Sequence, residues 1–362
     1  LSESVLGTNH IVTVSGARDL GALYVKQRQY ADAERYLAQA LSIDEQLFGL
    51  KAPQVAADLI ALADVDALQG EPGKADPLLK RAAEIKNVLP GGEVATEQVV
   101  ETPLSSANDR PVSDKWALLI GISNFKDTSI NLKYAAKDAT DFKNFLVNHQ
   151  AFRPDHVKLL TDETATRDNI IGMLGEKWLQ SHVKPDDLVV IYVSSHGSPA
   201  SAATGGTNFL VAHDTNKNSL AATGIPMQWL TQIVSDQVKS NRIILLLDVC
   251  HSGATGQKGI ARTGIDGREL QIGNGQMIIC SSMADQSSWE SRNYENGVFT
   301  RRLMEALLSN KNETTLGNAF KQLKVLVELE VLRDRGELQT PLLVNKKWAG
   351  KDPKLSVEPL HD

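Results

Sequence analysis

Two polar strings that follow apolar runs contain the residues best suited to covalent chemistry. His196 stands in "DLVVIYVSSHGS" and Cys250 stands in "RIILLLDVCHSG". A histidine within hydrogen-bond reach of a cysteine can take its proton and leave a nucleophilic thiolate. A glycine follows each string's key residue, at Gly197 and Gly253, and glycine permits tight turns whose amide N–H groups can stabilise an oxyanion. Together the strings indicate a cysteine nucleophile with a histidine base.

Other residues compete for these roles. Cys280 lies within the apolar run Met277–Ser281 with no histidine near it in sequence, and we expect it to point into the core. His251 is adjacent to Cys250, but neighbouring residues of an extended segment point to opposite sides, so we expect it to pack or to cap the turn. The other histidines lack the spacing of metal ligands and take surface or packing roles in this interpretation: His10, His149, His156, His182, His213 and His361.

The elements that must position this pair begin after Asp114, where short apolar runs alternate with amphipathic stretches. Such alternation predicts an α/β fold, a mostly parallel sheet flanked by helices, in which ligands bind at the carboxyl ends of the strands. The predicted strands are Trp116–Ile122, Val157–Leu160, Leu188–Ser194, Phe209–Ala212, Ile243–Asp248 and Met277–Ser281. The predicted helices are Tyr134–Val147, Arg167–His182, Met227–Val238, Val298–Leu308 and Leu316–Leu332.

The N-terminal third of the chain is an internal repeat. Its apolar residues have helical spacing broken by polar turns, which predicts two helix pairs. Two pairs bury less apolar surface than repeat arrays need, so we expect this region to dock on another segment or to continue upstream of Leu1. The equivalent residues are separated by 42 positions: Leu20 and Leu62, Ala33 and Ala75, Leu37 and Leu79, Ile43 and Ile85.

These helices resemble tetratricopeptide repeats of the longer, kinesin-light-chain type over about residues 8–88, through "YADAERYLAQALSI" and "GKADPLLKRAAEI". The resemblance implies a small all-α region with a groove for a substrate or a regulator. The alternative is that the helices only brace the following domain. Residues 90–113 are poor in aromatic residues and lack periodicity, which is typical of a linker, so we assign the repeats to residues 1–89.

Composition and charge exclude several classes of protein. The chain has 362 residues with ordinary globular composition and a formal net charge of −6, so nucleic acid is not an expected partner. No apolar run approaches the ~18 residues that span a bilayer, and no secretory signal is visible, so no membrane association is expected. Two cysteines fit a reducing compartment, and we expect a cytoplasmic protein.

The region from about Asp114 to Asn345 resembles the caspase and metacaspase superfamily, through "SSHGS" and "DVCHSG". These strings are closer to the metacaspase-type and bacterial caspase-like pattern than to animal caspases, in which a Gln stands two residues before the Cys. The resemblance implies that Cys250 is the nucleophile, that His196 is the general acid and base, and that the N–H groups of Gly197 and Cys250 form the oxyanion hole. We therefore expect a caspase-like peptidase domain at residues 114–350 and a C-terminal tail at residues 351–362.

Acidic residues predict the substrate. Asp248, two residues before the cysteine, favours a cationic substrate side chain over an aspartate, although it can instead accept backbone hydrogen bonds at the strand end. The resemblance adds Asp138 in "LKYAAKDA" and Ser194, two residues before the histidine, as pocket residues. Ala135 and Lys137 depart from the Cys and Asn that metacaspases usually have there.

A second resemblance concerns the later half of the domain, where "SSMADQSSWE", "GVFTRRLMEAL" and "QTPLL" resemble the smaller-subunit half of the caspase fold. Animal caspases supply an arginine to an acidic substrate residue from a Ser-Trp-Arg string. This chain has Ser288, Trp289 and Glu290 instead, so an anion replaces the cation. With Asp138 and Asp248, this substitution predicts a protein or peptide substrate with Arg or Lys before the scissile bond.

Residues 254–275 are rich in glycine and are typical of an exposed connector, a preferred place for a proteolytic nick. They contain Lys258, Arg262 and Arg268, and we expect self-cleavage after one of them, Arg262 first. Metacaspases often need calcium, but Asp266 and Glu269 provide fewer oxygens than the six or more that calcium takes. We therefore expect no cofactor, with calcium dependence left open.

These features predict a cysteine endopeptidase whose helical repeats recruit a substrate or a regulator. The alternative is a catalytically silent caspase-like scaffold whose repeats bind a partner protein, although such pseudo-proteases typically lose the Cys or the His. A cysteine hydrolase of a non-peptide amide is a third hypothesis, which the absence of a GxGxxG loop disfavours.

Overall fold

The computed structural model describes residues 11–85, 110–198, 207–250, 270, 275–283, 286–309, 313–345, 348 and 351–360. The chain divides into two compact units. The first consists of Leu1–Val94 and Lys324–Leu338, and the second consists of Ala95–Leu323 and Gln339–Asp362. We call the first the repeat unit and the second the sheet unit.

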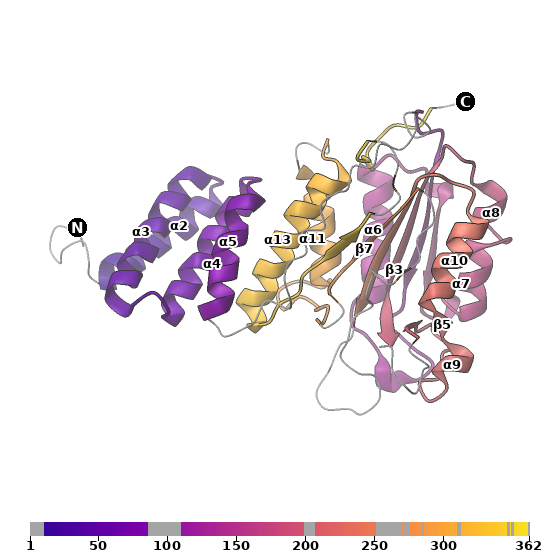
Figure 1. Cartoon of the computed structure of the whole chain (residues 1–362), viewed down its shortest axis with the longest axis horizontal. Helices are drawn as coiled ribbons and strands as arrows, with labels where there is room; N and C mark the ends of the chain where they lie inside the picture. Colours follow the sequence, from indigo (N-terminus) through magenta and orange to yellow (C-terminus); the bar gives the residue numbers. More distant parts are fainter. Residues whose placement is uncertain are drawn as a thin grey trace. The chain divides into compact units, whose positions relative to one another are not determined.

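The repeat unit contains two helix pairs, as the 42-residue offset predicts. The left-handed backbone at Arg28 and Gly70 turns the chain after the first helix of each pair. Leu62 is buried against Leu37, whereas its equivalent Leu20 is 39% exposed. The helices are α2 (Ile11–Lys26), α3 (Tyr30–Phe48), α4 (Pro53–Leu68) and α5 (Pro72–Ile85) (Figure 1).

A further helical segment completes the core of the repeat unit. Helix α13 (Leu316–Arg335) contributes residues 324–335 to this unit, and its apolar side chains pack with those of α4 and α5. This segment provides apolar surface that two helix pairs alone do not supply. The buried side chains that α13 contributes are Val325, Leu326, Leu329 and Leu332.

A sheet with strand order β2-β1-β3-β6-β7-β8 forms the centre of the sheet unit. The strands pair in parallel except for β8, which is antiparallel to β7. Every residue of β1, β3 and β7 is buried, as expected for strands covered on both faces. The strands are β1 (Lys115–Gly121), β2 (Val157–Thr161), β3 (Leu188–Ser198), β6 (Ile243–Cys250), β7 (Gln276–Cys280) and β8 (Leu342–Val344).

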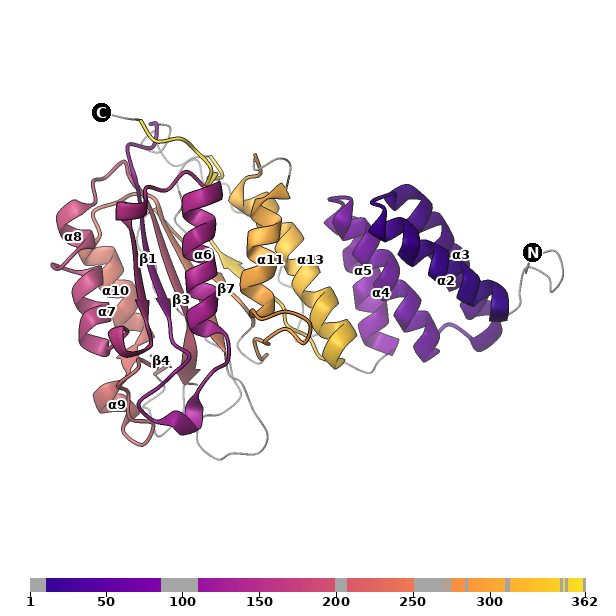
Figure 2. The ribbon, with the colours of Figure 1, turned by 180° about the vertical axis from the view of Figure 1, so that it is seen from behind.

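Helices cover both faces of this sheet, which confirms the α/β fold expected from the sequence. In both views α7, α8 and α10 lie on one face, and α6 and α11 lie on the other (Figures 1 and 2). The one long helix predicted at 167–182 is instead two helices, and Gly175 follows the first of them. The bounds are α6 (Ala135–His149), α7 (Arg167–Leu174), α8 (Leu179–His182), α10 (Met227–Gln237) and α11 (Val298–Leu307).

Short elements lie in the loops between the strands and helices of the sheet unit. Strand β4 pairs antiparallel with the extension of β3 and with β5, rather than lying in the parallel stack. The loop after β1 contains η2, and other loops contain η3, η4 and α9. Their bounds are β4 (Phe209–Leu210), β5 (Ile225–Pro226), η2 (Thr128–Ile130), η3 (Pro154–His156), η4 (Asp162–Thr164) and α9 (Leu220–Thr223).

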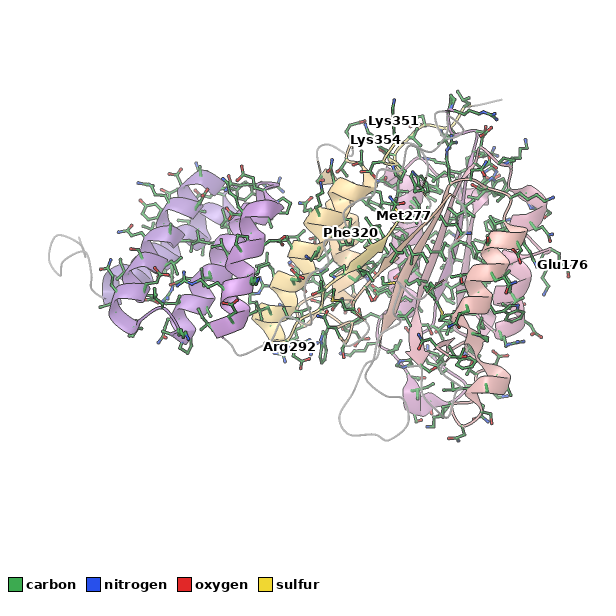
Figure 3. The ribbon with its side chains drawn as sticks, viewed as in Figure 1. Glu176, Met277, Arg292, Phe320, Lys351 and Lys354 are labelled. Atoms are coloured by element: carbon green, nitrogen blue, oxygen red, sulfur yellow. The ribbon has the colours of Figure 1, made fainter. Side chains whose placement is uncertain are left out.

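The other end of the sheet holds the C-terminal segment. The Nζ atom of Lys115 donates hydrogen bonds to the carbonyl oxygens of Gln150, Leu355 and Val357 at 2.5, 3.1 and 2.7 Å. Burial lowers the pKa of Lys115 to about 8. Figure 3 shows Lys351 and Lys354 of this segment at the end of the sheet unit away from Arg292.

Candidate active site

His196 and Cys250 are partners in the register of two neighbouring strands. Strands β3 and β6 run parallel, and their paired positions extend from Val189 with Ile243 to His196 with Cys250 at the carboxyl ends. Adjacent strands lie ~4.8 Å apart. The two residues selected from the sequence therefore lie side by side at the carboxyl ends of two central strands. The side chain of Cys250 lies outside the described part of the structure.

A backbone carbonyl orients the imidazole of His196. The residue is 5% exposed, and its Nε2 atom lies 2.7 Å from the carbonyl oxygen of Ile130. A carbonyl oxygen only accepts hydrogen bonds, so Nε2 bears the proton and Nδ1 of the neutral ring bears the lone pair. Phe125 packs against the ring, with centroids 5.3 Å apart. This tautomer allows His196 to take a proton at Nδ1.

The loop that carries Ile130 is fixed by side chains from other elements. Asp162 follows β2, and its Oδ1 accepts hydrogen bonds from the backbone N–H groups of Ser123 and Asn124, both at 2.8 Å. Lys217 forms an ion pair with Asp127 at 2.9 Å. Hydrogen bonds from Ser129 and Lys217 lower the pKa of Asp127 to about 2. These contacts hold the acceptor of the histidine in place.

The backbone that follows His196 is also fixed. Gly197 is paired with Leu210 of β4, and the N–H group of Val211 donates to the carbonyl oxygen of His196 at 3.0 Å. The neighbouring Ser195 donates from Oγ to the carbonyl oxygen of Val211 at 2.7 Å. The segment that was expected to supply an oxyanion donor is therefore held on both sides of the imidazole.

Asp248 is a buried carboxylate two residues before the cysteine, beside Ser194 in the register of β3 and β6. Its Oδ1 accepts a hydrogen bond from Ser288 Oγ at 2.9 Å, and its Oδ2 accepts one from Thr300 Oγ1 at 2.8 Å. The hydroxyl of Tyr192 lies 2.6 Å from Thr300 Oγ1. The hydroxyl groups of two side chains therefore bind the two oxygens of this carboxylate.

Asp138 lies in the first turn of α6 and is also buried. It accepts hydrogen bonds from the N–H group of Gly297, at 3.0 Å to Oδ2, and from Nδ2 of Asn296, at 2.9 Å to Oδ1. A Cβ atom on Gly297 would lie 2.9 Å from Oδ2 of Asp138 and 3.3 Å from Oδ2 of Asp248. The two acids therefore flank one glycine, where there is no room for a side chain.

The pKa values of this cluster reflect burial and mutual charge. Burial, with a further contribution from the charge of Asp248, raises the pKa of Asp138 to about 8. Burial and both carboxylates also raise the pKa of Tyr192 well above its usual value. With a pKa of about 8, the carboxyl group of Asp138 keeps its proton at neutral pH.

The string Ser288, Trp289, Glu290 forms one side of a short hairpin. The N–H group of Val298 donates to the carbonyl oxygen of Trp289 at 2.9 Å, and Glu290 pairs with Gly297. Ser288 is directed at Asp248 as described. Glu290 instead uses Oε1 to accept from the N–H groups of Lys133 and Tyr134, at 2.7 and 3.2 Å, just before α6. Ser288 therefore bonds to Asp248, and Glu290 bonds to the backbone just before α6.

Several residues of this site were not identified from the sequence. Ile130, Asp162 and Thr300 act through a carbonyl or through hydrogen bonds between distant segments, which no local pattern records. Gln339 lies in "QTPLL", which was noted only as a resemblance, and its amide bonds to Ser288 and to the backbone of Trp289. A polar residue shortly after a predicted strand, as at Asp162 two residues beyond Leu160, was an available signal.

The structure also describes the second cysteine and the features expected of metal and membrane binding. Cys280 is buried in the core and is paired in strand register with Leu247 and Leu342. No group of three or more His, Cys, Asp or Glu side chains in the described ranges is arranged to hold a metal ion. Among the described helices, none is long and apolar enough to cross a membrane. The expected cleavage positions Lys258, Arg262 and Arg268 lie outside the described residues, as do Asp266 and Glu269.

The repeat unit contains a cavity of about 440 Å³ between α2, α3 and α4. Arg18 lies at its edge, donating from Nε to Asp58 at 2.7 Å and also pairing with Asp44. Both aspartates are buried, and burial raises the pKa of Asp58. The cavity is lined by Arg18, Ala22, Val25, Lys26, Leu37, Ala57, Asp58, Ala61 and Asp64.

Comparison with protein families gives two matches. A model for the caspase domain matches residues 114–349, and a model for the tetratricopeptide repeat matches residues 2–87.

Similar proteins include metacaspases. Metacaspase-1 of Eremothecium gossypii is 27% identical over 156 residues, covering 39% of this chain and 32% of the relative. Metacaspase-1 of Saccharomyces cerevisiae is 27% identical over 182 residues, with 46% and 39% covered. Metacaspase-3 of Arabidopsis thaliana is 26% identical over 160 residues, with 40% and 41% covered. The matched regions span less than half of the length of these relatives.

Solved structures that align with this chain include a protein of Geobacter sulfurreducens. The TM-score is 0.48 and the identity is 16%, with 68% of this chain and 97% of that one covered. Caspase-1 from Spodoptera frugiperda has a TM-score of 0.47 and 14% identity over 67% of this chain and 94% of its own.

Proposed function

This chain belongs to the caspase domain family and has tetratricopeptide repeats at its N-terminal end, and we propose that it is a cysteine endopeptidase that cleaves after Arg or Lys. The observation that carries the proposal is the register of His196 with Cys250, with the histidine oriented by Ile130. In this proposal Cys250 is the nucleophile and His196 the general acid and base.

The reaction begins with a proton transfer from the Cys250 thiol to Nδ1 of His196. The thiolate then attacks the scissile carbonyl carbon, and the N–H groups of Gly197 and Cys250 stabilise the resulting oxyanion. His196 gives its proton to the leaving amine as the C–N bond breaks. Water, deprotonated by His196, attacks the thioester, releases the carboxylic acid and restores the thiol. The hydrogen bond from Nε2 to Ile130 keeps the ring aligned throughout.

Substrate choice in this proposal rests on Asp138 and Asp248. Both are buried, and they flank Gly297, so a guanidinium or ammonium group that enters beside them meets negative charge in a low dielectric. Arrival of the cation lowers the pKa of Asp138 and releases its proton. An aspartate in the same position instead places a second negative charge beside Asp248, which excludes it. Ser194 and Ser288 provide the polar wall.

We further propose that the enzyme cuts its own connector at residues 254–275, after Arg262, Lys258 or Arg268. The basic preference argued from Asp138 and Asp248 makes these residues suitable substrates. The repeats then recruit a protein substrate or a regulator through the 440 Å³ cavity between α2, α3 and α4.

The proposal is tested with two fluorogenic peptides that differ only in Arg or Asp before the scissile bond, using wild type and Cys250→Ala. We expect cleavage of the Arg peptide alone, abolished by the substitution. Cys280→Ala is the matched control and keeps full activity, because that cysteine is in the core. Preferential cleavage of the Asp peptide contradicts the assignment of the acid pair, and cleavage that survives Cys250→Ala contradicts the nucleophile.

A further inference from the structure

A single buried glutamine joins the segments around the acid pair. Gln339 is fully buried, and its Nε2 donates to the carbonyl oxygen of Ser281 at 3.0 Å and to Ser288 Oγ at 3.1 Å. Its Oε1 accepts from the N–H group of Trp289 at 2.8 Å. One side chain therefore bonds both ends of the segment 281–289.

A second hydrogen bond joins the same two parts of the chain in the opposite sense, from the backbone beside Gln339 to a side chain that lies between Ser281 and Trp289. Oε1 of Gln286 accepts from the N–H group of Thr340 at 2.5 Å, and Oγ of Ser282 donates to the carbonyl oxygen of Gln286 at 3.2 Å. Gln286, Ser282 and Thr340 are all buried, so water does not compete for these bonds. Residues 339–340 thus act as a template that holds residues 281–282 and 286–289.

The template reaches the acid that selects the substrate. Ser288 Oγ accepts from Gln339 and donates to Oδ1 of Asp248, so the three side chains form one chain of hydrogen bonds. Asp248 lies two residues before Cys250 on β6. A displacement of Gln339 therefore moves the donor that orients the Asp248 carboxylate, without touching His196.

The chain that leads into Gln339 belongs to the other unit. Residues 324–338 are part of the repeat unit, and Gln339 is the first residue that returns to the sheet unit. Leu338, one residue before it, packs against the same core as Leu329 of α13 and Leu79 of α5. The covalent chain therefore runs directly from the repeat core to the template residue.

We propose that Gln339 is a positioning residue for the substrate pocket, and that through Leu338 it makes the affinity for a basic substrate depend on the packing of the repeat core. This inference rests on the proposed function, because it concerns the same pocket. A partner that reorders the repeats changes the binding of substrates too short to touch them.

The first test replaces Gln339 by Ala and by Glu. Glu keeps the acceptor for Trp289 but loses the donor to Ser281 and Ser288. We expect KM for the Arg peptide to rise about tenfold in both variants, because the donor that holds Ser288 toward Asp248 is lost, with a smaller change in kcat. Alkylation of Cys250 by iodoacetamide, which needs no pocket, stays at the wild-type rate. Val344→Ala on neighbouring β8 is the control for a merely destabilised sheet, and it leaves KM unchanged.

The second test is a double-mutant cycle with Leu329→Ala, which removes a buried contact from α13 to the repeat core. We expect Leu329→Ala to raise KM of the same short peptide several-fold in the wild-type background. We expect no further effect in Gln339→Ala, because the side chain that couples the repeat core to Ser288 and Asp248 is already absent. Ile43→Ala, buried in the repeat unit in a different cluster, is the control for general damage and leaves KM unchanged.

Wild-type KM in both Gln339 variants overturns the positioning role. Additive effects of Leu329→Ala and Gln339→Ala on KM, or an unchanged KM in Leu329→Ala, contradict the proposed coupling of the repeat core to the pocket through Leu338. In either case the wild-type enzyme still cleaves the Arg peptide. Failure of the proposed function gives a different result, since then the wild type cleaves neither peptide and Cys250 shows no fast alkylation.

Discussion

The carboxyl group of Asp138 on α6 faces the carboxylate of Asp248 on β6 across Gly297, and burial together with the charge of Asp248 raises its pKa to about 8. Two buried acids so arranged do not both ionise readily. In the proposed function a basic side chain of the substrate supplies a positive charge beside them, so binding of substrate and loss of the Asp138 proton are coupled. This coupling has consequences for activity and for stability.

The affinity for a basic substrate depends on pH through Asp138. Above a pH of about 8 the carboxyl is already ionised and no proton must leave, so we expect KM for the Arg peptide to fall as pH rises from 6.5 to 9. In Asp138→Asn this decrease disappears and KM is higher at alkaline pH. The rate of Cys250 alkylation is measured over the same pH range. It reports the titration of His196 and Cys250 and so separates it from the titration of Asp138. A KM profile that is the same in both proteins contradicts the role of Asp138.

The same acid makes stability depend on pH. Its pKa is about 8 in the folded protein and near 3.8 in the unfolded chain, so the folded state binds more protons between these values. The resulting contribution is present at low pH and is lost as pH rises through about 8. We expect urea unfolding midpoints of the wild type to decline over this range relative to those of Asp138→Asn. Parallel midpoints for the two proteins from pH 5 to 9 contradict the raised pKa.

Asp248 and Glu290 differ in what their carboxylates bind, and their substitutions should differ accordingly. Asp248→Asn removes a buried charge from the pocket, and we expect KM for the Arg peptide to rise by about a hundredfold. Glu290→Ala removes acceptors for the N–H groups of Lys133 and Tyr134 before α6, and costs about 1 kcal/mol of unfolding free energy with little change in KM. Kinetics and urea unfolding of both variants check this. A large KM effect of Glu290→Ala places that acid in the pocket instead.

Asp162 is expected to affect catalysis without touching the substrate. Asp162→Ala removes the acceptor for Ser123 and Asn124, so the loop that carries Ile130 is no longer held and the imidazole loses its fixed partner. We expect kcat to fall about tenfold, with KM nearly unchanged and slower alkylation of Cys250 at pH 7. Asp155→Ala, an exposed acid paired with Arg153, is the control and leaves all three unchanged. Equal kinetics of the two variants rule out this role.

Deleting the repeats is expected to damage the protein rather than only remove a partner site. Without residues 1–90, the buried side chains of Val325, Leu326, Leu329 and Leu332 lose the α4 and α5 surface that covers them. We expect the truncated protein to aggregate, as measured by light scattering during purification. A monodisperse truncated protein with wild-type thermal stability contradicts this account of α13.

The sequence predicted the sheet well because its central strands are apolar over their whole length. The predicted strands at 188–194 and 243–248 correspond to β3 and β6, and the choice of His196 and Cys250 depends on these two alone. The boundary errors have local causes. Strand β3 extends to Ser198 because β4 pairs with it, and the helix predicted through Gly175 is interrupted there.

The surroundings of the site were harder to predict, because they depend on bonds between segments far apart in the chain. Thr300 and Ser288 hold Asp248 from positions more than 35 residues away, and Ile130 acts on His196 through a backbone carbonyl that any residue possesses. The charge pattern offered Glu290 as a third acid beside Asp138 and Asp248, and it held no sign that Oε1 of Glu290 accepts a bond from the backbone N–H group of Lys133 before α6. Charge alone does not reveal which partner a carboxylate has.

The central claim, that Cys250 is a nucleophile activated by His196 beside an acidic pocket, is tested most directly by covalent labelling. A peptidyl chloromethyl ketone ending in Arg, and its analogue ending in Asp, are incubated with wild type and His196→Ala, and the modified residue is located by peptide mass mapping. We predict one adduct, on Cys250, formed quickly by the Arg reagent in the wild type and at least about a hundredfold more slowly in His196→Ala. Modification of Cys280, equal rates in the two proteins, or faster labelling by the Asp reagent would contradict the account.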